Sequence, residues 1–134
     1  MTREFVNIPN EILVPGIKVK PFSDGVRVGN TLYVSGRIGL DPQTGMPPGD
    51  VTAEARALME NLQGVLAAAG MSLKHLAMVT VFAPDVADFA AFNDVYLTYF
   101  DKDALPARAF VGSGQLLFGA RFELTAIAVR DDAA

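Results

Sequence analysis

The sequence contains no cysteine and a single histidine, His75. The lack of cysteine excludes disulfides, thiolate nucleophiles, cysteine-ligated zinc and iron–sulfur clusters. A single histidine excludes a metal site built from several histidines, and any Ser-His-Asp triad would depend on His75. His75 falls in a short polar segment between an expected helix and an expected strand, where a solvated surface side chain is the preferred interpretation. We therefore expect no metal site.

Positive charge and long apolar runs are also scarce. The net charge is −4 at pH 7 and the pI is near 4.8, which argues against a phosphate-binding surface and against a nucleic-acid partner. No apolar run approaches the roughly 18 residues of a membrane span. The opening segment MTREFVNIPN has neither the basic nor the apolar region of a signal peptide. These absences predict a soluble, cytoplasmic protein without membrane contact.

Apolar residues, in contrast, make up 51% of the 134 residues. This length and composition predict one hydrophobic core and a single domain over residues 1–134. No linker, internal repeat or low-complexity segment divides the chain. Nucleotide-binding loops are missing as well, since Gly112-Ser113-Gly114 is too short a signal for a dinucleotide site.

The hydrophobic pattern predicts an α+β protein with about six strands. Apolar residues at helical spacing predict helices from Thr52 to Ala69 and from about Val86 to Phe100. Gly29-Asn30 has the composition of a two-residue hairpin turn. Extended segments, including a lead-in strand interrupted by prolines, are expected at residues 1–20, 26–28, 32–34, 77–82, 107–112 and 121–130.

Two helices cannot cover both faces of such a sheet, so both are expected on one face. On the last strand, the residues that should meet the helices are Phe122, Leu124, Ala126 and Ala128. The opposite face of this strand carries both apolar and charged residues, since it includes Ile127 and Val129 as well as Glu123. This pattern predicts that another copy of the chain buries part of the second face.

Two charged residues lie in otherwise apolar expected strands, Arg108 and Glu123. On the pattern alone, the simpler interpretations are an arginine that reaches water from a strand edge and a solvated glutamate. If the two met in one cleft, the guanidinium would bind a substrate carboxylate and the glutamate would position or deprotonate a water. Such a pair suits the addition of water to an electrophilic carbon beside a carboxylate, such as an imine.

Motifs spread over most of the chain carry a family resemblance. They are Pro21-Phe22-Ser23-Asp24-Gly25-Val26, Tyr33-Val34-Ser35-Gly36-Arg37-Ile38-Gly39, Asp41-Pro42-Gln43-Thr44-Gly45, Pro106-Ala107-Arg108-Ala109 and Phe122-Glu123-Leu124-Thr125-Ala126-Ile127-Ala128-Val129. In this order and spacing they resemble the RidA family of enamine/imine deaminases, from Pro21 to Val129. The resemblance implies a chorismate-mutase-like fold and a homotrimer with a central barrel and ligand clefts between subunits.

The resemblance also implies a site that hydrolyses short-lived 2-imino acids to 2-oxo acids and ammonia without a cofactor. Arg108 falls on the carboxylate-binding arginine of the family, and Glu123 falls on its water-orienting glutamate. The remaining implied substrate contacts are Phe22, Ser35, Gly36, Asn93 and the backbone carbonyl of Phe110.

Several residues depart from the family pattern around this site. Phe22 replaces the usual tyrosine, Arg37 replaces the usual glutamine, and Asp24 follows Pro-Phe-Ser. Residues 112–120 also lack the common Leu-Pro-Lys form. Two alternatives therefore stay open: a non-catalytic trimer that binds small carboxylates or regulates, and, with less physical support, an endoribonuclease or translation inhibitor.

Overall fold

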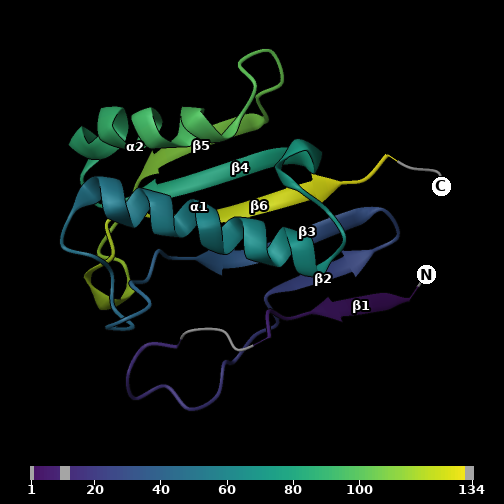
Figure 1. Cartoon of the computed structure of the whole chain (residues 1–134), viewed down its shortest axis with the longest axis horizontal. Coiled ribbons are helices and arrows are strands. Elements are labelled where there is room, and N and C mark those ends of the chain that lie inside the picture. Colours follow the sequence, from purple (N-terminus) through teal and green to yellow (C-terminus); the bar gives the residue numbers. More distant parts are fainter. Residues whose placement is uncertain (1, 10–12, 132–134) are drawn as a thin grey trace.

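A mixed six-stranded sheet forms the framework of the chain (Figure 1). The computed structural model describes residues 2–9 and 13–131. The strands are Arg3–Val6 (β1), Gly25–Val28 (β2), Thr31–Arg37 (β3), Leu76–Ala83 (β4), Ala107–Gly112 (β5) and Glu123–Val129 (β6). Their order is β1-β2-β3-β6-β4-β5, with β4 and β5 parallel and every other pair antiparallel. The predicted α+β class is confirmed.

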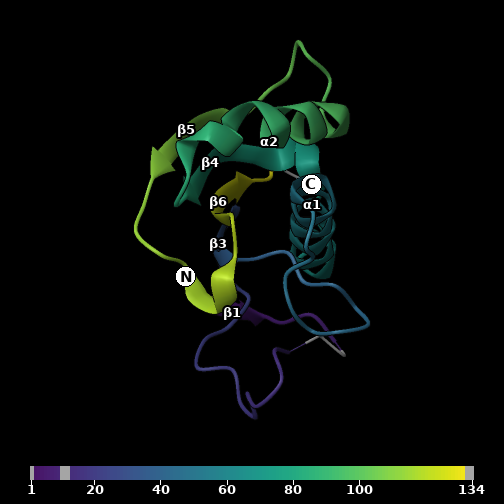
Figure 2. The same cartoon turned by 90° about the vertical axis from the view of Figure 1, so that its left-hand side faces the viewer.

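Two α-helices, Val51–Ala68 (α1) and Phe89–Tyr96 (α2), lie against one face of this sheet (Figure 2). The side chain of Asp50 caps α1 by accepting a hydrogen bond from the backbone of Ala53 (3.0 Å). Phe122, directly before β6, is buried as predicted, and so are the inward residues of β6, Leu124, Ala126 and Ala128. No helix in the described part of the chain has both the length and the apolar character needed to cross a membrane.

The predicted hairpin is present, with Gly29 at a φ of 61° between β2 and β3. The expected lead-in strand is wrong over most of its length. Among the described residues of this segment, only Arg3–Val6 pairs with the sheet, and the chain turns at Pro15 and Gly16, where Gly16 has a φ of 91°. Residues 10–12 of the expected strand lie outside the described residues.

The expected helix over 86–100 is divided into three parts. The Asp85 carboxylate accepts a hydrogen bond from the backbone of Ala87 and starts a short 3-10 turn at Val86–Asp88. Another 3-10 turn, Leu97–Tyr99, follows α2, and the Thr98 hydroxyl donates to the Val95 carbonyl (2.6 Å). Local side-chain to backbone hydrogen bonds therefore shorten the helix that the apolar spacing predicts.

Apolar side chains form a row across the sheet face that no described helix covers. The row follows the strand pairings and consists of Phe5, Val26, Tyr33, Ile127, Met78 and Ala107. Phe5 is 64% exposed and Tyr33 is 51% exposed. This face therefore presents apolar surface to the surroundings of the isolated chain.

The contact between the end of β3 and α1 depends on Gly39. A Cβ atom at this position would collide with the backbone oxygen of Glu54 and the backbone nitrogen of Leu58. Both atoms belong to the helix backbone, so they can move only if α1 moves.

We expect Gly39→Ala to lower the free energy of unfolding by about 1–3 kcal/mol, because the added methyl separates α1 from the sheet. Gly49→Ala is the matched control, since its Cβ would enter open space. That control should change stability by less than about 1 kcal/mol. Urea unfolding of both variants measures the difference, and equal values would contradict the close contact at Gly39.

Candidate active site

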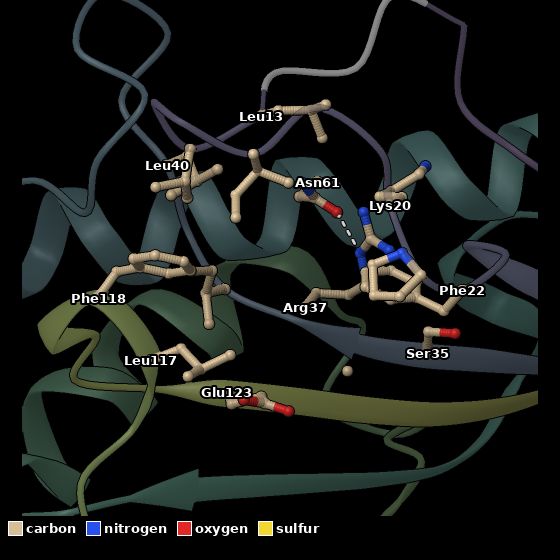
Figure 3. Close-up of a pocket in the computed structure, with 15 residues that line it drawn as sticks. Leu13, Lys20, Phe22, Ser35, Arg37, Leu40, Asn61, Leu117, Phe118 and Glu123 are labelled. Atoms are coloured by element: carbon tan, nitrogen blue, oxygen red, sulfur yellow. Dashed lines mark hydrogen bonds between the residues drawn. The ribbon is translucent and has the colours of Figure 1, made fainter.

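A pocket of about 510 Å³ opens beside the ends of β3 and β6 (Figure 3). Four of the residues expected at the site line it: Phe22, Ser35, Gly36 and Glu123. The other lining residues are Leu13, Val14, Ile17, Lys20, Pro21, Arg37, Ile38, Leu40, Asn61, Leu117 and Phe118. The pocket is therefore largely apolar, with a carboxylate and a few other polar groups in its wall.

Glu123 owes its place to the alternation of β6. Phe122 is fully buried on the helix side, so the next side chain lies on the opposite face. There the carboxylate of Glu123 lies over Gly36, where a Cβ atom would collide with it. A β-bulge between Val34 and Arg37 shifts the register of β3 at this point. Gly36 is therefore the residue that lets a carboxylate approach the backbone of β3.

A buried carboxylate fixes the start of β6. Glu54, in the first turn of α1, accepts hydrogen bonds from the backbone of Arg121 (2.6 Å) and Phe122 (3.3 Å) and from the Arg121 guanidinium (3.0 Å). Burial raises the pKa of Glu54, although these hydrogen bonds oppose the shift. The contact ties α1 to the two residues that precede Glu123.

Ser35 attaches the segment that carries Phe22 to β3. Its hydroxyl donates to the carbonyl of Ser23 (2.6 Å), and its backbone N–H donates to the carbonyl of Asp24 (2.9 Å). Phe22 is 46% exposed, and its ring lies at the pocket with Lys20 Nζ 6.0 Å from the ring centroid. Ser35 thus contributes to the pocket by fixing the position of the segment that carries the Phe22 ring.

Two of the departures from the family pattern form one buried ion pair. Arg37 Nη1 lies 2.8 Å from Asp24 Oδ1, and the side chains are only 3% and 0% exposed. Arg37 Nε also donates to the side-chain oxygen of Asn61 (2.7 Å), as Figure 3 shows. The second oxygen of Asp24 accepts from Lys20 Nζ (2.7 Å) and from the backbone of Ile8 (2.8 Å). The pair connects α1, β3 and the segment before β2.

We expect Asp24→Asn to lower the free energy of unfolding by about 3–5 kcal/mol, because the buried Arg37 then loses the charge of the Asp24 carboxylate. Arg37→Gln should cost less, since Lys20 and the Ile8 N–H still contact Asp24. The double variant should lose clearly less unfolding free energy than the sum of the losses of the two single variants. Urea unfolding of the wild type, the two single variants and the double variant gives the coupling free energy between Asp24 and Arg37. Strictly additive losses of stability would contradict this coupling.

Arg108 lies elsewhere, on the edge strand β5. It pairs with Val79, which belongs to the core on the helix side. Its guanidinium carbon is 4.7 Å from the ring centroid of Tyr96 and 5.7 Å and 6.0 Å from those of Phe89 and Phe92. The arginine is thus held against aromatic faces of α2, an arrangement that favours a planar cation.

The expected site residues therefore fall into two groups. Phe22, Ser35, Gly36 and Glu123 meet in the pocket. Asn93 belongs to α2, and the Phe110 ring lies 5.8 Å from that of Phe92 and 5.7 Å from the Arg108 guanidinium carbon. Within one chain the structure assembles each group, but it places Arg108 and Glu123 on opposite faces of the sheet.

Tyr96 joins the second group, and the sequence did not assign it to the site. The apolar spacing over residues 86–100 predicted the helix that carries Tyr96, but not the arginine stacked on it. Within the described residues, the buried Tyr96 hydroxyl and Asn93 Oδ1 have no hydrogen-bond partner. Burial raises the pKa of Tyr96 from 10.0 to about 12, while the charge of Arg108 opposes the shift.

Because this pKa is raised, the stability that Tyr96 contributes is complete below pH 10 and is lost as the pH rises toward 12. Between pH 10 and pH 12, the melting temperature of Tyr96→Phe should therefore decrease less with pH than that of the wild type. Tyrosinate absorbance gives a second measurement. The absorbance of the folded wild type minus that of the variant reports Tyr96 alone, and it should titrate with a pKa of about 12. If this absorbance difference titrated near the ordinary tyrosine pKa of 10.0, the result would contradict the burial of the Tyr96 hydroxyl.

Comparison with known proteins identifies the family. The sequence profile of the endoribonuclease L-PSP family matches residues 17–130. This chain belongs to that family. The match confirms the resemblance to the RidA family, because mouse 2-iminobutanoate/2-iminopropanoate deaminase is 42% identical over 113 residues, or 84% of this chain and 83% of the mouse protein.

Other RidA-family relatives agree in sequence and in structure. Protein DfrA of Myxococcus xanthus is 46% identical over 114 residues, or 83% of this chain and 86% of DfrA. The crystal structure of Escherichia coli TdcF with bound serine superposes with a TM-score of 0.81 at 35% identity. That superposition covers 96% of this chain and 99% of the TdcF chain. The family profile covers residues 17–130, the range in which Phe22, Ser35, Gly36, Asn93, Arg108, Phe110 and Glu123 lie.

Proposed function

We propose that this protein is a hydrolytic deaminase of reactive enamines and imines, of the 2-iminopropanoate and 2-iminobutanoate type, that acts in the cytoplasm. The observation that carries the proposal is the carboxylate of Glu123, held over Gly36 in the wall of an apolar pocket. A relative named as a deaminase of these two compounds supports it. Arg108 binds the carboxylate of the substrate, and Glu123 positions the attacking water.

The reaction is a hydrolysis without redox change, so an arginine, a glutamate and a water suffice. Glu123 and the backbone carbonyl of Phe110 hold the water, which attacks the imine carbon as Glu123 takes its proton. Glu123 returns this proton to the nitrogen of the tetrahedral adduct, then takes the proton of the new hydroxyl group and passes it to the same nitrogen, so that the C–N bond breaks, the carbonyl forms and ammonia leaves. One imine and one water give one 2-oxo acid and one ammonia. Positioning and fixed electrostatics supply the acceleration, and no cofactor takes part.

The proposal requires more than one copy of the chain in each site. Arg108 and Glu123 lie on opposite faces of the sheet in a single chain, so the arginine of one copy must face the glutamate of the next. The apolar row from Phe5 to Ala107 supplies a surface for this association. We therefore include in the proposal the chorismate-mutase-like homotrimer, with a central barrel and clefts between subunits.

We expect Arg108→Ala and Glu123→Ala each to lower kcat/KM for 2-iminopropanoate by at least roughly 100-fold, since each removes a group needed in the transition state. Coupled assays of ammonia and 2-oxo acid release measure the rates. Arg56→Ala, an exposed change on α1, is the matched control and should keep the wild-type rate. Equal rates for the wild type and Arg108→Ala would refute the mechanism.

A second experiment tests the division of the site between copies. Arg108→Ala and Glu123→Ala chains carrying different affinity tags are expressed together, and the mixed oligomers are isolated. A mixed trimer contains two copies of one variant and one copy of the other. One of its three sites then combines an intact arginine with an intact glutamate, so the mixed trimers should recover about one third of the wild-type activity, which neither variant has alone. Mixed oligomers without activity would show that the two residues do not meet across subunits.

The same assays distinguish the alternatives. A non-catalytic trimer would bind 2-oxo acids through Arg108 and release no ammonia from any imine. An endoribonuclease would cleave RNA in an Arg108-dependent way, although a net charge of −4 offers little attraction for it. His75, the one histidine, is engaged in a local turn, where its Nδ1 accepts a hydrogen bond from the backbone of Ser72 (3.0 Å), and it does not line the pocket that contains Glu123.

A further inference from the structure

We propose that the pocket selects 2-imino acids with a bulky apolar side chain, such as those derived from leucine or phenylalanine, and that Leu117 and Phe118 determine this selection. The inference rests on the proposed deaminase function and concerns the same pocket. It goes beyond 2-iminopropanoate and 2-iminobutanoate, whose side chains are only a methyl and an ethyl group.

The size of the pocket is the first observation. Its volume of about 510 Å³ lies within the roughly 300–1,000 Å³ of pockets that hold drug-sized ligands. In the part of the site that one chain supplies, a three-carbon imino acid fills only a small part of this space. The unfilled part would hold water against apolar walls, whereas a longer apolar side chain would displace that water.

The distribution of groups is the second observation. Figure 3 shows Leu40, Leu117 and Phe118 on one side of the pocket, with Phe22, Ser35 and Arg37 on the other. Glu123 and Leu117 both line this pocket. If the imine carbon is at Glu123 and the carboxylate faces Arg108 of the next copy, the third substituent of that carbon extends along the apolar side.

The polar groups of the pocket do not oppose an apolar substituent. Arg37 is engaged with Asp24 and Asn61, and the Ser35 hydroxyl donates to Ser23. These groups therefore stay hydrogen-bonded when an apolar side chain displaces solvent, so its entry does not leave them unsatisfied. A polar side chain, in contrast, would lose water at Leu40 and Phe118 without a replacement.

The backbone at Phe118 is the third observation. Its φ of 60° and ψ of 24° place a phenylalanine in the left-handed region, where it is the one residue other than glycine among those described. This conformation costs roughly 1–2 kcal/mol for a residue with a side chain. The Phe118 ring is still 40% exposed, and Leu117 is 69% exposed, so neither is placed there by the core. The strained turn instead presents two apolar side chains to the pocket.

The test compares imines generated in place from leucine, phenylalanine and alanine by an L-amino acid oxidase. We expect the wild type to show a kcat/KM at least roughly tenfold higher for the leucine- and phenylalanine-derived imines than for 2-iminopropanoate. Leu117→Ala and Phe118→Gly should each bring this ratio toward one. Glycine is chosen at 118 because it removes the ring and accepts the left-handed backbone.

Leu97→Ala is the matched control, since Leu97 is also exposed, at 51%, but lies after α2 and outside the pocket. Its substrate ratio should equal that of the wild type. Thermal unfolding and molecular mass are measured for every variant. If a pocket variant fails to fold or assemble, inhibition of the wild type decides: 4-methyl-2-oxopentanoate should inhibit at least roughly tenfold more strongly than pyruvate.

The outcomes separate the two proposals. No turnover of any imine refutes the deaminase function. The selection by Leu117 and Phe118 is refuted if the wild type turns over 2-iminopropanoate without a preference for the larger imines. It is also refuted if both pocket variants retain the wild-type preference. Equal inhibition by 4-methyl-2-oxopentanoate and pyruvate also refutes it.

Discussion

The attachment of α1 to the start of β6 through Glu54 is the constraint on which the site depends. One buried carboxylate binds two consecutive backbone N–H groups, at Arg121 and Phe122, and so fixes the strand before its first paired residue. Phe122 then enters the core, and the alternation of the strand directs Glu123 to the opposite face. A helix on one side of the sheet thereby determines where a carboxylate lies on the other.

The sheet separates the groups that the proposed reaction needs. The aromatic faces of α2 hold Arg108 on the helix side, while the end of β3 receives Glu123 over Gly36. A folded monomer thus presents a cation and a carboxylate that cannot act on one small molecule. Association of identical copies is, on this view, a condition of the chemistry, and the apolar row on the uncovered face supplies surface for it.

The sequence predicted those features that depend on local periodicity. Alternation identified the buried face of β6, and Gly29-Asn30 identified the hairpin. It did not predict that Asp24 pairs with Arg37, because that contact joins segments brought together only by the fold. The left-handed conformation of Phe118 was equally hidden, since phenylalanine normally avoids it. The strand expected over residues 1–20 was too long, because the observed pairing with β2 ends at Val6 and the chain turns at Gly16.

The ion pair between Asp24 and Arg37 has a consequence for how this chain can change. Replacement of Asp24 leaves the Arg37 charge buried without the Asp24 carboxylate, and replacement of Arg37 leaves Asp24 with Lys20 and the Ile8 N–H, whereas a joint replacement removes both charges of the pair together. A lineage that changes one of them therefore passes through a less stable protein before it reaches the second change. The two positions should behave as one heritable unit, and among relatives they should differ from this chain together.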